Sequence, residues 1–491
     1  MNFRALLKHT LIYGSGVWAG KVIGFIMIPV YTRALRPADY GVLELISRTT
    51  DVIALVLGMG LASALLRFHA GAKSEKERGR VISTSVFFAG AVGLLAAVGL
   101  ASAAGPISTV VLGSAQYRPC LVLALIAMGL ELCAAVPMVL LRIHERSGLF
   151  TAVSLARLVT ALSLNIYLVV VLRMGVWGVM VSNLVGISLV MSILVLATRK
   201  AWRPALDMRI LRAMLAYSLP LVPCSFAMFV LNFGDRYVLR ACCGLGVLGV
   251  YSLGYKICMV MPALVMEPLG LAWSAVVFTV ADCADAGRVY ARYFNGFMFC
   301  VVFACLWLSA LARDIVSVMA APSYIDAYKI VPVVSLGLAA WAASSVFETG
   351  ILIEKKTCYR TVGHLTSAVV VTVAYFILIP RYGAMGAAWA TVLGFSAMAA
   401  STYVFAQRLH PIPYGMRRAA LLLGVGGGVY GLTQIVPGQG HALTALARAL
   451  LVSAYPGLLY VVGYFDGENV AAAKGVAIEA LHRSRVRSTS C

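Results

Sequence analysis

Five basic side chains lie inside apolar stretches of this sequence, where they could bind a charged ligand. They are Lys21, Arg48, Arg157, Arg236 and Lys256. An unpaired charge at bilayer depth costs at least about 2.5–3.5 kcal/mol, so it is retained where the side chain faces water, a partner or a charged substrate. The pattern therefore indicates a membrane transporter with a cationic cavity.

Carboxylates also occur inside the apolar stretches, as possible partners of these cations. They are Asp51, Glu131, Asp235, Glu267 and Glu348. A carboxylate at this depth either neutralises a neighbouring cation or carries a coupling proton. Partnering is the interpretation that we favour.

Three of the cations also have a structural interpretation. Arg48 and Asp51 are three residues apart on one helix face and could neutralise each other. Arg157 is close enough to a predicted helix end to snorkel to the surface. Asp235 and Arg236 could tie two helices together.

Long apolar helices must position these charges. The chain has 491 residues, of which 61% are hydrophobic and 12% are charged, whereas a soluble domain is charged at about a quarter of its positions. A stretch of about 20 apolar residues crosses the hydrocarbon core. Fourteen such segments fit: 10–32, 42–66, 81–104, 119–141, 150–172, 176–198, 213–235, 247–278, 293–312, 330–352, 361–379, 384–406, 417–436 and 443–465. The sequence predicts an all-α integral membrane protein.

Lysine and arginine are distributed unevenly over the predicted loops. About 26 of the 40 lie on alternate loops and the two ends, and about 10 lie on the opposite loops. This asymmetry predicts that both termini are cytoplasmic. The apolar run that follows Arg4 and Lys8 has no small-residue cleavage site, so we expect it to remain as the first span. Anionic lipid headgroups account for the net charge of +21, with no need for nucleic acid.

An internal repeat divides the chain. The segments RMGVWGVMVSNLVG at Arg173 and RYGAMGAAWATVLG at Arg381 share their glycine spacing at an offset of 208, and Gly41-Val-Leu resembles Gly246-Val-Leu at an offset close to 205. Parallel repeats are a transporter architecture with the substrate site between the halves. The predicted parts are an N-lobe of six helices (1–205), a C-lobe of six helices (206–410), helices 13 and 14 (411–466) and a basic cytoplasmic tail (467–491).

Other chemistries lack their motifs. The eleven cysteines include no CxxC pair, and the seven histidines lack metal-ligand spacing. The string SGVWAGKV (15–22) lacks the first glycine and the final Ser or Thr of a P-loop. We therefore expect no enzyme activity, metal or cofactor, and we leave coupling to H⁺ or Na⁺ open.

Several segments together resemble a known family. They are GKVIGFIMIPVYTRALRPADYGVLELI (20–46), DVIALVLGMGLASALLRF (51–68), DRYVLRACCGLGVLGVYSLGYKI (235–257), SYIDAYKIVPVVSLG (323–337) and IPRYGAMGAAWATVLG (379–394). They are similar to the Wzx-like polysaccharide flippases of the multidrug/oligosaccharidyl-lipid/polysaccharide (MOP, MATE-like) exporter superfamily. The resemblance implies twelve core helices in two lobes, often with two more at the C-terminus.

The same resemblance implies a substrate and a location. It implies that a polyprenyl-diphosphate-linked oligosaccharide is moved to the outer leaflet of the bacterial cytoplasmic (inner) membrane, in contact with membrane lipids and with other polysaccharide assembly proteins as further partners. Arginine binds phosphate as a planar fork and lysine as a point charge, which suits the five cations. The alternatives are a flippase for the peptidoglycan lipid precursor, a MATE-type drug or cation antiporter, and a membrane glycosyltransferase, which the short loops disfavour.

Overall fold

The described part of the chain is helical throughout. The computed structural model describes residues 24–198, 206–281, 285–436 and 442–465, and these ranges contain no β-strand. Ten of their helical segments are long and apolar enough to cross a membrane. The longest, Met208–Ser274, has 67 residues and so contains more than one crossing. The predicted all-α membrane fold is confirmed, whereas the count of fourteen spans and the cytoplasmic termini stay predictions.

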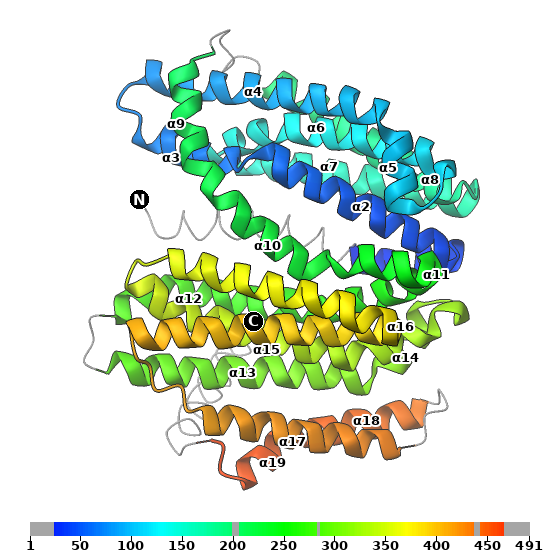
Figure 1. The fold of residues 1–491 in the computed structure, drawn as a ribbon, viewed down its shortest axis with the longest axis vertical. Coiled ribbons are helices and arrows are strands. Elements are labelled where there is room, and N and C mark those ends of the chain that lie inside the picture. The colour runs from blue at the N-terminus through cyan, green and yellow to red at the C-terminus, as the bar shows by residue number, and fades with distance from the viewer. Residues whose placement is uncertain (1–23, 199–205, 282–284, 437–441, 466–491) are drawn as a thin grey trace, which may run out of the picture.

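The first lobe contains α2 to α8, the blue and cyan helices of Figure 1. Gly93 of α4 and Gly129 of α6 let these two helices pack closely, since a Cβ on either glycine would lie 2.5 Å from the carbonyl oxygen of the other. The helices are α2 (Pro37–Gly58), α3 (Leu61–Gly71), α4 (Glu75–Ser102), α5 (Ala104–Leu112), α6 (Arg118–Ile143), α7 (Ser147–Asn165) and α8 (Gly175–Thr198).

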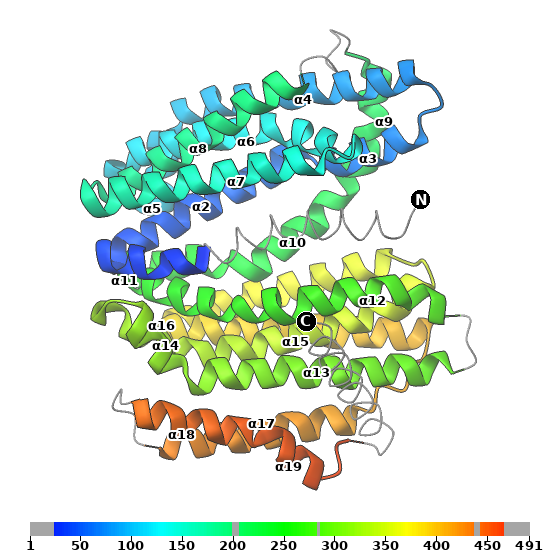
Figure 2. The same cartoon turned by 180° about the vertical axis from the view of Figure 1, so that it is seen from behind.

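In the second lobe, α11 to α15 follow the order of long and short helices of α2 to α6, and α10 runs diagonally between the two lobes (Figures 1 and 2). Its helices are α9 (Met208–Ser218), α10 (Val222–Phe233), α11 (Asp235–Cys258), α12 (Glu267–Val280), α13 (Ala286–Ala310), α14 (Ala312–Met319), α15 (Ile330–Ile353) and α16 (Cys358–Leu409). The repeat assigns α9 to the second lobe, yet α9 packs against α3 and α4 of the first, where Met214 is fully buried.

Three further helices form a separate layer on the second lobe (Figure 1). They are α17 (Met416–Ile435), α18 (Ala442–Ser453) and α19 (Tyr455–Val461). Tyr455 stacks on Phe299 and Phe303 of α13 at 6.3 Å. Arg448 of α18 pairs with Asp314 of α14 at 3.1 Å, so aromatic packing and one ion pair attach this layer to the lobe.

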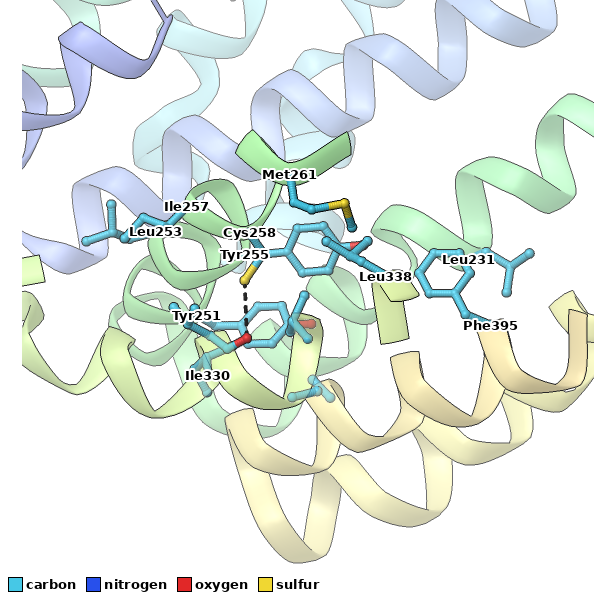
Figure 3. Packing of buried hydrophobic residues seen from close by; sticks show 14 of the residues in the cluster. Leu231, Tyr251, Leu253, Tyr255, Ile257, Cys258, Met261, Ile330, Leu338 and Phe395 are labelled. Carbon is cyan, nitrogen blue, oxygen red and sulfur yellow. Dashed lines mark hydrogen bonds between the residues drawn. The ribbon is translucent and has the colours of Figure 1, made fainter. Parts of the chain in front are cut away.

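The long run at 247–278 is broken, as its two prolines predict. A π-helical turn, Pro262–Met266, separates α11 from α12, which begins at Glu267. Proline removes a backbone donor and clashes with the preceding turn, which explains a break at this place. Before the break, α11 packs against α15 and α16: Tyr255 and Cys258 lie near Leu338 of α15, and Phe395 of α16 lies beside Leu231 in the same cluster (Figure 3).

The two lobes meet through glycines on α2 and α11. A Cβ on Gly41 would lie 2.2 Å from the carbonyl oxygen of Leu245, and a Cβ on Gly249 would lie 1.9 Å from that of Pro37. The two contacts are equivalent, since Leu245 and Gly249 of α11 lie 208 positions after Pro37 and Gly41 of α2. The structure therefore pairs Gly41 with Gly249 and not with Gly246, and the offset equals that of the motifs at Arg173 and Arg381.

Hydrogen bonds tie the lobes at this same end. The Tyr324 hydroxyl donates to the Leu35 carbonyl oxygen at 3.0 Å, and the Thr32 hydroxyl donates to that of Met319 at 3.2 Å. The lobes are thus in direct contact at the end formed by α2, α11 and α14. The charge distribution of the loops predicts that this end is the outer one.

Candidate functional site

Glu44 lies at the centre of the charged groups between the lobes. Its Oε1 atom accepts a hydrogen bond from Nε of Arg48 at 2.9 Å, one turn further along α2. The same oxygen lies 3.6 Å from Nε of Arg236 on α11. One carboxylate oxygen therefore faces a cation from each lobe.

Arg236 is fully enclosed. It is 1% exposed, and its Nη1 atom donates to Asp235 and to the carbonyl oxygen of Asn232, both at 2.6 Å. Asp235 also accepts a short hydrogen bond from the Tyr251 hydroxyl. A buried charge needs such partners to offset desolvation. The geometry agrees with the structural interpretation of this pair, in which Arg236 holds α11 and α2 together.

Arg48 is more accessible than Arg236. Its side chain is 25% exposed, and Nη1 donates to Asp51 at 2.7 Å. Its guanidinium lies 4.2 Å from the ring centre of Phe233, at the end of α10. The Arg236 guanidinium lies 5.1 Å from the same ring. A phenyl face attracts cations within about 6 Å, so Phe233 places α10 in contact with both arginines.

Lys256 of α11 is half-buried beside this cluster. Its Nζ atom lies 6.0 Å from the ring centre of Tyr40, and within the described ranges it has no carboxylate at ion-pair distance. The charges of Glu44 and Arg48 act on it electrostatically. Lys256 lies 208 positions after Arg48, so the two cations occupy equivalent places in the two repeats.

Arg157 and Glu131 form an ion pair inside the first lobe, between α7 and α6. Both side chains are 40% exposed and line a pocket of about 480 Å³ among α6, α7 and α8. Asp51 is close enough to Glu131 for the two charges to interact. Charged side chains therefore continue from the lobe interface into this pocket. A second pocket of about 410 Å³, mainly apolar, lies beside α10 and is lined by Leu57, Phe88, Leu132 and Ser225 among others.

The other predicted residues lie apart from this cluster. Glu348 of α15 pairs with Arg360 at 3.1 Å and with His364 at 3.2 Å, both on α16. Glu267 lines an aromatic pocket of about 380 Å³ in the second lobe. Lys21 lies outside the described residues.

Sequence reasoning missed Glu44. It lies four residues before Arg48 on the same helix, which is the spacing of a stabilising ion pair and was a detectable signal. The pairing of Glu348 with His364 and of His364 with Cys224 had no such signal, because these residues lie on three helices. Within the described ranges, no cluster of three His, Cys, Asp or Glu side chains could hold a metal ion.

The family follows from a sequence match over more than half of the chain. Residues 6–274 match the family described as polysaccharide biosynthesis protein. The chain belongs to this family. No curated protein matches this sequence.

Solved structures of transporters share the fold. The structure described as "Lipid II flippase MurJ, inward closed conformation" superposes with a TM-score of 0.73 at 13% identity, covering 92% of this chain and 99% of that one. The structure of an inward-facing MATE family multidrug transporter of the MOP superfamily has a TM-score of 0.61 at 16% identity, and the match covers 82% of this chain and 94% of that one. The structure of a MOP superfamily transporter from Pyrococcus furiosus has a TM-score of 0.53 at 14% identity, and the match covers 82% of this chain and 95% of that one. The predicted likeness to MOP superfamily transporters is confirmed at the level of the fold, and the long apolar helices indicate a multi-pass membrane protein.

Proposed function

We propose that this protein is a flippase for a polyprenyl-diphosphate-linked oligosaccharide. It moves this lipid from the cytoplasmic to the outer leaflet of the bacterial inner membrane, for the biosynthesis of a surface polysaccharide. The two lobes alternate between inward and outward access. The polyprenyl tail stays in the lipid while the headgroup crosses between the lobes.

One observation carries the proposal: Arg48 and Lys256 occupy equivalent positions of the two repeats and flank Glu44 at the lobe interface. A diphosphate offers several anionic oxygens, so it can bind one cation from each lobe at once. Arginine contributes paired N–H donors, and lysine contributes a compact charge. A ligand that bridges the two lobes also senses their relative position, which alternating access requires.

Asp51 occupies the place that a phosphate would take. It accepts a hydrogen bond from Nη1 of Arg48 and is 52% exposed, so it can turn towards water when a phosphate replaces it. Glu44 then holds Nε of Arg48 and keeps the guanidinium oriented. Charge-assisted hydrogen bonds to phosphate are about twice as strong as neutral ones, which favours the exchange.

A flippase for the peptidoglycan lipid precursor is the second candidate. Its substrate carries the same polyprenyl diphosphate, so the cationic pair fits both lipids equally. A drug or cation antiporter fits less well, because cations are at least as prominent as carboxylates at the interface. The consequences of deleting the gene distinguish the candidates.

The test is analysis of glycans in a deletion strain. We expect loss of a surface polysaccharide, accumulation of its lipid-linked precursor on the cytoplasmic leaflet, and unchanged drug resistance. Death on deletion would favour the peptidoglycan precursor, and drug sensitivity with intact polysaccharide would contradict the proposal. Complementation with wild type and with the double variant Arg48→Ala, Lys256→Ala then tests the site, and the double variant should fail to restore export at normal expression.

A further inference from the structure

A thiol, an imidazole and a carboxylate form a chain inside the second lobe. Sγ of Cys224 on α10 lies 3.2 Å from Nδ1 of His364 on α16. Nε2 of His364 lies 3.2 Å from Oε1 of Glu348 on α15. The three groups come from three different helices, and no residue of the cationic cluster takes part.

The imidazole in the middle of the chain is shielded from water, while Cys224 at one end is half-buried. His364 is 3% exposed, and the Glu348 side chain is 13% exposed. The other oxygen of Glu348 lies 3.1 Å from Nε of Arg360, whose side chain is 46% exposed. The ionisable groups around the imidazole are therefore Cys224 from α10, Glu348 from α15 and, through Glu348, Arg360 from its own helix.

We propose that His364, held between Cys224 and Glu348, is a proton-binding site that couples proton movement to transport. The coupling rests on the function proposed above. In the resting state Nε2–H donates to the Glu348 carboxylate, and Nδ1 accepts from the thiol. One proton adds to the lone pair of Nδ1, and the resulting imidazolium then donates at both nitrogens and shares the Glu348 carboxylate with Arg360.

Proton binding changes the contact between α16 and α10. Before protonation, Cys224 is a donor to the imidazole. After protonation, the imidazole is a donor to the sulfur, which is a weak acceptor. The bond that joins the two helices is thus reversed, from a weak S–H donor to a charged N–H donor. This is a two-state contact at a helix that crosses between the lobes (Figure 1).

The same helix reaches the cationic cluster. Cys224 lies near the start of α10, and Phe233, beneath the Arg48 guanidinium, lies at its end. The nine residue steps from Cys224 to Phe233 span about 13 Å of helix. A ligand that moves Arg48 and a proton that changes the Cys224 contact therefore act on opposite ends of one rigid element.

The entry side of the proton follows from Arg360. Arg360 lies in the first turn of α16, just after the turn at Glu354–Thr357. The charge distribution of the loops predicts that this turn is cytoplasmic. In this structure the His364 site is therefore accessible from the predicted cytoplasmic side, opposite the end where Gly41 and Gly249 bring the lobes together. A proton taken up from the other side needs the lobes to change position, as coupling requires.

Flux in liposomes tests the coupling. Wild type, His364→Asn and Glu348→Gln are reconstituted, and the movement of a fluorescent polyprenyl-diphosphate monosaccharide is followed with and without a pH gradient. We expect a gradient to change the wild-type rate several-fold and to leave the rates of both variants unchanged. The control is His410→Asn, because His410 also faces a carboxylate, Glu354 at 3.3 Å, but at an exposed position.

Alkylation of Cys224 by N-ethylmaleimide tests proton binding without transport. Its rate is followed against pH by peptide mass spectrometry. The wild type and His410→Asn should share an inflection that His364→Asn removes, and equal profiles in wild type and His364→Asn would overturn the proton site. A gradient response that survives in His364→Asn, or is absent from an active wild type, overturns the coupling. A wild type that moves no probe contradicts the proposed function and the coupling together, while the alkylation profile still decides the proton site.

Discussion

Glu44 and Arg236 face each other across the boundary between the lobes, with 3.6 Å between the carboxylate oxygen and the guanidinium Nε. Glu44 also holds Arg48, and Arg236 also holds Asp235. This pair connects the enclosed charges of the second lobe with the more accessible arginine of the first. The stability of the lobe contact therefore depends on a residue that also orients the proposed ligand site.

Replacing Glu44 by Gln should lower the unfolding temperature of the detergent-solubilised protein. Losing one partner of a buried pair costs up to about 3–5 kcal/mol. The cost is smaller here because Arg236 keeps Asp235 as a second partner. Glu75→Gln is the matched control, because Glu75 pairs with Arg78 at 2.7 Å but is 87% exposed. Such surface pairs contribute about 0–1 kcal/mol. Equal shifts in both variants would show that the Glu44 contacts do not stabilise the lobe contact.

Gly41→Ala should separate the lobes at the end where α2 meets α11. The added Cβ would lie 2.2 Å from a backbone oxygen, which cannot move aside as a side chain could. Hydrogen–deuterium exchange should increase in residues 37–41 and 245–249.

The control for Gly41→Ala is Gly246→Ala, because nothing lies within 4 Å of a Cβ at that position. It should leave exchange in both segments unchanged. The comparison also tests the register of the repeat, since Gly246 is the residue that the sequence motif alone pairs with Gly41. Increased exchange in Gly246→Ala but not in Gly41→Ala would contradict the register with an offset of 208.

The two cations of the proposed site, Arg48 and Lys256, should differ in how well transport tolerates replacing one basic residue by the other. Arg48→Lys loses the second N–H group that Arg48 uses to bind Glu44 and Asp51 together, so we expect transport of the polyprenyl-diphosphate probe to fall at least tenfold. Lys256→Arg keeps a charge at a position without a fork-shaped partner, and its rate should stay within about threefold of wild type. Equal losses in both variants would argue that only the charge matters at each position.

Arg448→Ala should loosen the layer of α17 to α19 without unfolding the lobes. Arg448 is 7% exposed, pairs with Asp314 at 3.1 Å and donates to the Val436 carbonyl oxygen at 3.2 Å. Its loss leaves two half-buried acceptors without this donor. Limited proteolysis should cut faster in residues 410–415, whereas Arg288→Ala, which breaks an exposed pair with Asp285, should not change the rate. Unchanged cleavage in Arg448→Ala would show that aromatic packing alone holds the layer.

Much of the fold was predictable because hydropathy and glycine spacing are local properties of the chain. The break between α11 and α12 follows from Pro262 and Pro268, which act on their own helix whatever surrounds it. The offset of 208 was visible at Arg173 and Arg381. At Gly41 it was assigned to the wrong glycine, because the motif Gly-Val-Leu cannot tell which glycine contacts the other lobe.

The candidate site was only partly predictable. Arg48 and Arg236 look alike in the sequence, since each is a cation with an acidic neighbour inside an apolar stretch. In the structure Arg48 is 25% exposed at the lobe interface, and Arg236 is enclosed by Asp235, Glu44 and two tyrosines. The difference comes from which helices face each residue.

The sequence by itself determined that the chain is a helical membrane protein, and it predicted two repeats and cations at bilayer depth. The physical reason is that the cost of placing polar groups in hydrocarbon is set residue by residue. Only the tertiary structure decided which cations are neutralised and which remain accessible, and it alone brought Cys224, His364 and Glu348 together. Electrostatic pairing acts over a few ångströms, and those distances are set by the packing of helices that are far apart in the chain.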